Sequence, residues 1–345
     1  NATDAPNLSM AISMHRMLAG TESFNQDISN WDVSTITDMS NLFSSATIFN
    51  QDISGWDVSS VVNMRSMFSG ATAFNQPIGG WDVSAVANTT SMFERAQLFD
   101  QPLENWNVSS VTIMESMFES AQVFNQNIND WDVSSVTNTR SMFENSTVFN
   151  QPLGDWDTGE ILTTEKMFNG ASAFNQPINT WDTSFVTNME SMFEDAIAYN
   201  QELNDWNVAS VQTMERMFKG ASLFNQNINS WNTREVTTME EMFEDAIAFN
   251  EPLNNWRVRN VTNMSRMFQN ATMFNQELSE WDLEEVEMRA MFRLASAFDQ
   301  YLGDWNLSQT TNLSQMLDNS GMSRMNYDNT VIAWAEQDVP LGLTL

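Results

Sequence analysis

Few side chains in this chain could take part in catalysis or bind a ligand directly. The 345 residues include no cysteine and a single histidine, His15, whereas 45 acidic against 14 basic residues give a formal net charge of −31. Disulfides, thiolate zinc sites and cysteine nucleophiles are therefore excluded, and acid–base chemistry would have to fall on carboxylates. The acidic excess also disfavours nucleic-acid partners, because phosphate backbones are recognised through lysine and arginine.

Carboxylates recur one residue after a series of evenly spaced tryptophans. This acidic column consists of Asp32, Asp57, Asp82, Asn107, Asp132, Asp157, Asp182, Asn207, Asn232, Arg257, Asp282 and Asn306. The neighbours on either side are apolar and should face inward, so we expect the column itself to face outward. Two interpretations follow: an exposed, solubilising ladder, or a row of carboxylates that binds calcium, a cationic ligand or a glycan.

Three arginines interrupt the acidic surface. Arg234, Arg257 and Arg259 occupy outward positions in two consecutive repeats. One period further on, Arg257 should meet Asp282 and Arg259 should meet Glu284, so cross-strand ion pairs would account for both arginines. The alternative interpretation is a contact with an anionic or carboxylate ligand.

The tryptophans reveal the elements that must position these side chains. They recur at intervals of 25 residues from Trp31 to Trp281, and the last interval, to Trp305, is 24. Phe-Asn-Gln triplets keep the same period, which gives twelve units after an initial half unit. A period of 25 is too short for the four strands of a propeller blade and suits a stacked solenoid, whose coils run about 20–29 residues in the leucine-rich class.

Within one unit, the apolar residues change their spacing. Ile53, Trp56 and Val58 suggest a short strand over residues 53–58, and Ser59 is a suitable helix N-cap. Apolar residues at steps of three and four over residues 61–71 predict a short helix. The predicted fold is an α/β solenoid, a leucine-rich-repeat-like right-handed coil with one parallel strand and one short helix per 25-residue repeat.

The predicted solenoid has a cap at each end. We divide the chain into an N-terminal cap and half repeat (1–23), a twelve-repeat solenoid (24–317) and a C-terminal cap (318–345). The last segment carries Tyr327, Val331, Ile332 and Trp334, which suggest an amphipathic closing helix. Asparagines of the Phe-Asn-Gln triplets are expected to form a ladder of amides that bond from coil to coil.

The repeat resembles those of a known family. The unit Phe74-Asn75-Gln76-Pro77-Ile78-Gly79-Gly80-Trp81-Asp82-Val83-Ser84, with the apolar stripe that follows it, is similar to BspA-like leucine-rich repeat surface proteins. The stretch from Asn326 to Ala335 is similar to the segment that closes such arrays. The resemblance implies a secreted or cell-surface protein used in adhesion, and it carries no catalytic motif.

The predicted function is a non-enzymatic surface module that presents an extended acidic face to a glycan or protein ligand. The residues predicted to bind are Asp32, Asp57, Asp82, Asp132, Asp157, Asp182, Arg234, Arg257, Arg259 and Asp282. No cofactor is expected, although calcium would suit the carboxylates. No apolar run approaches the roughly 20 residues of a membrane span, so we expect no direct membrane insertion and a place within a larger surface protein. The alternatives are a purely structural stalk and a carboxylate-dependent glycan-active enzyme.

Overall fold

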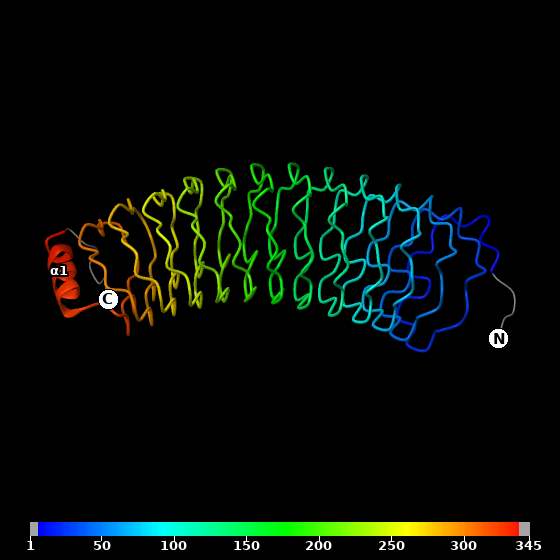
Figure 1. The fold of residues 1–345 in the computed structure, drawn as a ribbon, viewed down its shortest axis with the longest axis horizontal. Coiled ribbons are helices and arrows are strands. Elements are labelled where there is room, and N and C mark those ends of the chain that lie inside the picture. The colour runs from blue at the N-terminus through cyan, green and yellow to red at the C-terminus, as the bar shows by residue number, and fades with distance from the viewer. Residues whose placement is uncertain (1–5, 338–345) are drawn as a thin grey trace. The chain divides into compact units, whose positions relative to one another are not determined.

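The computed structural model describes residues 6–337 as two compact units. Among the described residues, the first comprises residues 6–161 and Met167–Gln176, and the second comprises Leu162–Lys166 and residues 177–337. Each unit is a stack of 25-residue coils (Figure 1). Isolated parallel bridges join equivalent residues of neighbouring coils, from Ser13 to Asn138 in the first unit and from Thr163 to Asn312 in the second. The predicted solenoid-like stacking is therefore present in both units.

The predicted strand and helix of each repeat are wrong. Within residues 6–337 the single α-helix is α1, Arg324–Ala335, and the repeats consist of turns and bends with one bridging residue each. That bridge lies at Asn63, inside the predicted helix of residues 61–71, whereas residues 53–58 form a turn instead of a strand.

Left-handed residues explain why the apolar stripe does not become a helix. Ser66 and Gly70 have φ angles of 53° and 70°, which a right-handed helix cannot contain. The amide of Ser66 donates to the carbonyl of Thr90 in the next coil (2.8 Å), whereas the amide of Met67 donates back to Met64 (3.1 Å). Backbone hydrogen bonds thus alternate between the next coil and the same coil, and every third or fourth residue still points inward.

The distance between coils gives a second reason. The stacked rings of Phe68 and Phe93, one repeat apart, have centroids 5.7 Å apart. Packed helices need about 8–10 Å between their axes. Coils stacked this closely have room for turns and not for a helix in every coil.

The residues predicted to form the core do so. Trp56, Met64, Phe68 and Phe74 are at most 4% exposed, and their counterparts in later coils are equally buried. Buried indoles also make hydrogen bonds, as Trp81 Nε1 does with the carbonyl of Ile53 (3.1 Å). Continuous rows of stacked rings therefore bury aromatic surface without leaving the indole donors unsatisfied.

The predicted amide ladder is confirmed. The Oδ1 atom of Asn50 accepts hydrogen bonds from the amide of Asn75 (2.9 Å) and from Nε2 of Gln76 (2.9 Å). The same pair of bonds recurs from coil to coil in each unit, for example from Asn250 to Asn275 and Gln276. The Phe-Asn-Gln triplet thus supplies one acceptor and two donors for each step of the stack.

Helix α1 closes the C-terminal coil of the second unit. The Oδ1 atom of Asp299 accepts from the amide of Ser323 (2.7 Å) and from Nδ2 of Asn326 (2.9 Å), as it would from the next Asn-Gln pair. The indole of Trp334 donates to the carbonyl of Leu302 (2.9 Å), as a further repeat's tryptophan would. The cap therefore makes the same hydrogen bonds to the last coil that a further repeat would make.

The predicted closing helix is thus present, but it is not clearly amphipathic. Trp334 is 6% exposed, whereas Tyr327 and Ile332 are 41% and 59% exposed. Docking relies on Trp334 and on polar groups, including the buried Thr330 hydroxyl, which accepts from the amide of Leu302 (3.1 Å). In the described part of the chain, no helix has the length and apolar character needed to span a membrane.

The predicted end segments are described only in part. Residues 1–5 and 338–345 lie outside the described residues. In the N-terminal segment, Leu8 is buried, whereas Met10 and Ile12 are 93% and 69% exposed. The predicted boundaries at residues 23 and 317 stay predictions.

Candidate functional site

Each member of the acidic column is exposed at a turn, as predicted from its position after tryptophan. The Oδ1 atom of Asp57 accepts hydrogen bonds from the amide (3.1 Å) and the hydroxyl (2.6 Å) of Ser59. Asn107 makes the same two bonds to Ser109, at 3.2 and 2.7 Å. An acceptor oxygen at this position therefore supports the turn, and a negative charge is not required for it.

The turn also keeps the carboxylates ionised. Hydrogen bonds from the serine two residues later lower the pKa below its ordinary value at Asp32, Asp57, Asp82, Asp132 and Asp182. At Asp57, the charges of Asp82 and Asp32 act in the opposite direction. Within residues 6–337, no three histidine, aspartate or glutamate side chains lie together in a way that could hold a metal ion. A calcium site in the acidic column therefore stays a prediction without a geometric basis.

One coil of the second unit departs from this sequence pattern, although its backbone keeps the turn. The sequence Trp-Asp-Val-Ser-Ser of a typical repeat becomes Trp-Arg-Val-Arg-Asn at residues 256–260. Arg257 cannot accept the amide hydrogen bond that Asp or Asn accepts, and Arg259 replaces the serine donor. The hydrogen bonds that stabilise this turn in other coils therefore do not explain the two arginines.

The predicted pairing of these arginines is only half right. Arg259 pairs with Glu284, as expected, and its Nη1 also lies 3.1 Å from Asp282 Oδ2. The pairing predicted between Arg257 and Asp282 is wrong, because the forked guanidinium of Arg259 reaches both carboxylates of the next coil. Within residues 6–337, neither Arg257 nor Arg234 has an ion-pair partner.

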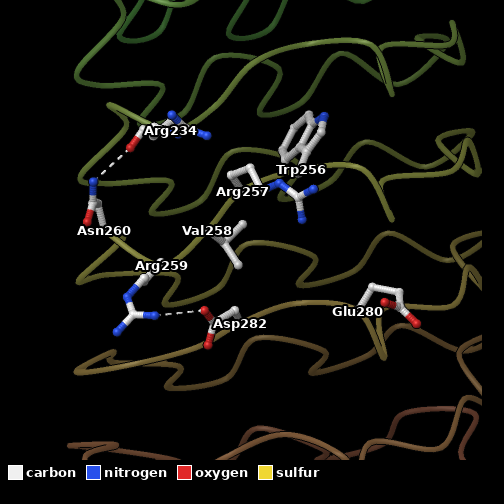
Figure 2. A pocket seen from close by; sticks show the side chains of 8 residues that line it. All are labelled: Arg234, Trp256, Arg257, Val258, Arg259, Asn260, Glu280 and Asp282. Carbon is white, nitrogen blue, oxygen red and sulfur yellow. Dashed lines mark hydrogen bonds and ion pairs between the residues drawn. The ribbon is translucent and has the colours of Figure 1, made fainter.

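The three arginines surround a hollow of about 300 Å³ in the second unit. Its lining residues are Arg234, Trp256, Arg257, Val258, Arg259, Asn260, Glu280 and Asp282. Figure 2 shows Arg257 and Glu280 on one side and Arg234, Arg259 and Asn260 on the other. Nδ2 of Asn260 donates to the carbonyl of Arg234 (2.8 Å), which ties the two coils together beside the hollow.

Two further hollows adjoin the first. One, of about 400 Å³, shares Arg257 and Glu280 with it, and the other, of about 270 Å³, shares Arg259 and Asp282. We call the three together the arginine groove. The remaining residues that line it are Asn254, Asn255, Glu277, Leu283, Glu284, Asn306, Ser308 and Gln309. The arginine groove brings together Arg234, Arg257, Arg259 and Asp282, and the other predicted binding residues lie outside it.

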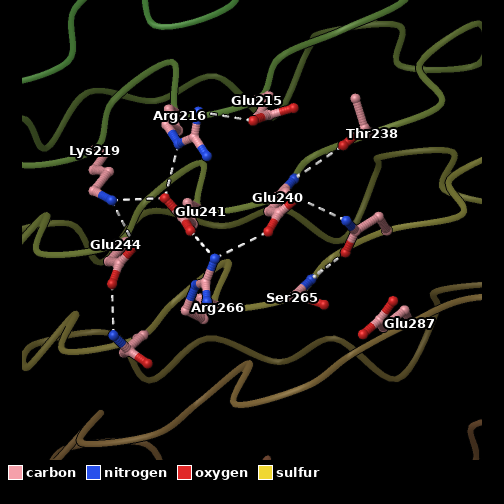
Figure 3. A network of polar contacts seen from close by, with 12 residues as sticks. Glu215, Arg216, Lys219, Thr238, Glu240, Glu241, Glu244, Ser265, Arg266 and Glu287 are labelled. Carbon is pink, nitrogen blue, oxygen red and sulfur yellow. Dashed lines mark hydrogen bonds and ion pairs between the residues drawn. The ribbon is translucent and has the colours of Figure 1, made fainter. Parts of the chain in front are cut away.

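A second charged cluster was missed by the sequence analysis (Figure 3). The carboxylate of Glu241, whose side chain is 5% exposed, contacts Lys219 Nζ (2.6 Å), Arg216 Nε (2.9 Å) and Arg266 Nη2. Lys219 also pairs with Glu244 (3.0 Å). The position that is serine in many repeats, such as Ser66, is occupied by Arg216, Glu241 and Arg266 in three consecutive repeats. These charged residues in place of serine could have predicted the cluster from the sequence.

Charge pairing sets the protonation state of this cluster. Burial raises the pKa of Glu241, but hydrogen bonds from Lys219 and Arg216 and the charge of Arg266 outweigh it and lower the pKa to about 2. Arg216, Lys219 and Arg266 all face carboxylates, so the cluster links consecutive coils and its cations are already engaged.

These coils define a solenoid-like repeat protein, and comparison with known proteins identifies its family. Five segments match a family described as "Mycoplasma protein of unknown function, DUF285": residues 1–101, 78–163, 150–256, 199–290 and 226–334. Together they span nearly the whole chain, which therefore belongs to the DUF285 family. The match does not single out BspA-like proteins, so that narrower resemblance stays a prediction.

Two other comparisons add little. None of the curated proteins matches the chain. Among solved structures, a chain of the "Crystal structure of TLR13-ssRNA13 complex" is similar at 9% sequence identity and a TM-score of 0.25. The alignment covers 92% of this chain and 56% of that one, so this chain spans little more than half of its length. Nothing about a ligand of the present chain follows from this likeness.

Proposed function

We propose that this protein is a non-enzymatic interaction module of the cell surface that binds an anionic ligand in the arginine groove. The observation that carries the proposal is a pair of exposed arginines, Arg234 and Arg257, that have no ion-pair partner among the described residues and lie beside a hollow in a chain of net charge −31. A guanidinium group binds carboxylate, sulfate or phosphate through paired hydrogen bonds. The acidic charge of the rest of the chain repels anions, so binding of an anion in this groove depends on these two arginines.

The repeat itself favours binding over catalysis. A catalytic acid–base pair needs two carboxylates in different environments, whereas the acidic column repeats one environment from coil to coil, with the same serine partner. Incubation with polysaccharides and analysis of the products tests the enzyme alternative. The appearance of shortened chains would overturn the proposal.

A location at the cell surface is part of the proposal. It is supported by the resemblance of the Phe-Asn-Gln and Trp-Asp-Val-Ser repeats to surface proteins and by the acidic composition. A stack of coils also suits this role, because equivalent side chains line up along an extended face. Surface labelling of intact cells that produce the protein, with an antibody and without permeabilisation, tests the location.

Binding is tested with a variant that returns the site to the repeat pattern. We expect wild-type protein to bind a polyanion such as poly-glutamate in titration calorimetry, and Arg257→Asp to weaken binding at least tenfold. The same variant should unfold at a slightly higher temperature, because the introduced carboxylate would restore the acceptor of the turn. Loss of binding together with gained stability cannot be attributed to misfolding.

The matched control is Arg65→Glu in the first unit. Arg65 is exposed, and the equivalent position of a later coil is Glu115, so the change imposes the same charge difference at a tolerant position. Binding by this variant should equal that of wild type. If Arg65→Glu weakens binding as much as Arg257→Asp does, net charge and not the arginine groove controls the interaction, and the proposal fails.

A further inference from the structure

We propose that the ligand of the arginine groove is an acidic polysaccharide in which charged and neutral sugars alternate, an inference that rests on the proposed function. The groove is longer than a small anion requires. Its central hollow continues on one side through Arg257 and Glu280 and on the other through Arg259 and Asp282. A ligand that filled all three hollows would be an extended chain.

The lining favours a sugar polymer over a protein partner. Trp256, Val258 and Leu283 are each 1% exposed, so their side chains belong to the core and offer no anchoring surface. The accessible groups are amides, carboxylates and a hydroxyl, such as Asn254, Asn306 and Ser308. Protein interfaces are anchored by buried aromatic and aliphatic groups, whereas amides and carboxylates bind the vicinal hydroxyl groups of sugars.

The positions of the charges set the pattern of the polymer. Arg234 and Arg259 are equivalent residues of consecutive coils, and Arg257 precedes Arg259 by two. Because Asp282 and Glu284 already neutralise Arg259, the cations of the groove that can serve a ligand are Arg234 and Arg257, on neighbouring coils. Parallel bridged segments lie about 4.8 Å apart, which is close to the length of one sugar unit. Arg257 is also two residues out of register with Arg234, which adds roughly 6.6 Å along the chain. These two cations therefore serve acidic groups about two sugars apart.

Carboxylates of the groove exclude denser polyanions. Glu277 and Glu280 line the hollow on one side of the centre, and Glu284 lines the hollow on the other, while Glu280 and Asp282 also border the centre. A polymer charged on every unit would bring some of its anions against these carboxylates, and like charges at such distances repel. Neutral sugars can lie there and accept or donate hydrogen bonds. A polymer in which charged and neutral sugars alternate can place its anions at the arginines and its neutral sugars beside the carboxylates.

The experiment compares defined oligosaccharides by titration calorimetry with the full chain. The probes are decasaccharides of hyaluronate and of unsulfated chondroitin, which alternate uronate with a neutral sugar, and decasaccharides of polygalacturonate, which is charged on every unit. Carboxyl-reduced hyaluronate is the uncharged control. Chondroitin sulfate, which carries a sulfate on the sugar that is neutral in chondroitin, is a second probe charged on every unit.

We expect the alternating polymers to bind at least tenfold more tightly than polygalacturonate and the reduced control to show no binding. Arg234→Ser, which restores the serine of other repeats, and Arg257→Asp should each weaken binding at least tenfold, and Arg65→Glu should not. A hyaluronate tetrasaccharide should bind more weakly than the decasaccharide, because it cannot fill the three hollows. Chondroitin sulfate should bind more weakly than unsulfated chondroitin, and the reverse order would contradict the exclusion of polymers charged on every unit.

Two outcomes would overturn the inference in distinguishable ways. If poly-glutamate binds as tightly as the decasaccharides, or if tetrasaccharide and decasaccharide bind equally, the groove recognises an anion without recognising a sugar chain, and the proposed function survives. If no anion binds the wild-type chain, both the inference and the proposed function fail.

Discussion

At the scale of single residues, one hydrogen bond accounts for most of the acidic column. Asp57 and Asn107 both accept the amide of the serine two residues later, so the repeat tolerates either residue. The aspartate adds a charge that the turn does not use. Arg257 cannot accept this bond, so its coil lacks the local hydrogen bond that Asp57 and Asn107 make.

This view predicts the effects of two substitutions at Asn107. Asn107→Ala removes the acceptor for Ser109 and should lower the free energy of unfolding by about 1 kcal/mol. Asn107→Asp keeps the acceptor and should remain close to wild type. Urea unfolding measures both variants. Equal losses in Ala and Asp would show that the amide group, not the acceptor oxygen, is what matters.

At the scale of the elements, the coil is built from turns where a helix was predicted. The sequence identified which residues point inward, because steps of three and four place Met64, Met67 and Phe68 on one side in either structure. It did not identify the backbone, because Ser66 carries no mark of its left-handed conformation. That conformation depends on bonds to the next coil, which are not local.

A glycine substitution distinguishes the two backbones. Gly in the middle of a helix costs about 1 kcal/mol relative to Ala, whereas a left-handed residue loses strain when it becomes glycine. Because Ser66 has a φ of 53°, Ser66→Gly should leave the free energy of unfolding unchanged or raise it. Because serine is itself poorer than alanine in a helix, urea unfolding would reveal a helix in this segment if the variant lost about 0.5 kcal/mol.

The candidate site was predicted in part. The exposed arginines and the pair between Arg259 and Glu284 follow from counting in steps of 25. The second contact of Arg259, with Asp282, does not follow, because it depends on the rotamer of a long side chain. The groove could not be predicted from the sequence either, because hollows depend on how side chains pack between coils and not on the period of the repeat.

At the scale of the whole molecule, which carries a net charge of −31, two groups of glutamates make the stability depend on pH in opposite ways. Burial raises the pKa of Glu119, Glu215 and Glu244, so their ionisation costs stability, and this cost is removed as the pH falls through their folded-state pKa values above 4.5. Despite the opposing effect of its own burial, Glu241 is held near a pKa of 2 by its cationic partners. Its contribution is complete above its unfolded value of 4.5 and is lost as the pH falls through 2.

We therefore expect the melting temperature to rise on mild acidification from neutral pH and to fall below a pH of 4.5. Thermal melts followed by circular dichroism over this range measure it. Glu241→Gln should melt lower than wild type at neutral pH, because it leaves Arg216, Lys219 and Arg266 without their shared partner. The variant should also lose less on strong acidification. A melting temperature that decreases steadily from neutral pH downward would contradict the assignment of opposing groups.

The C-terminal cap has a consequence for how such a chain can evolve. Trp334 and Asn326 satisfy atoms that recur identically in every coil, a carbonyl and an acceptor oxygen, instead of atoms peculiar to the final one. A duplication or loss of 25 residues inside the array would present α1 with the same docking surface as before. The number of repeats can therefore change while the C-terminal cap stays the same. A single repeat can also acquire new side chains, such as the arginines, while the other repeats keep the fold.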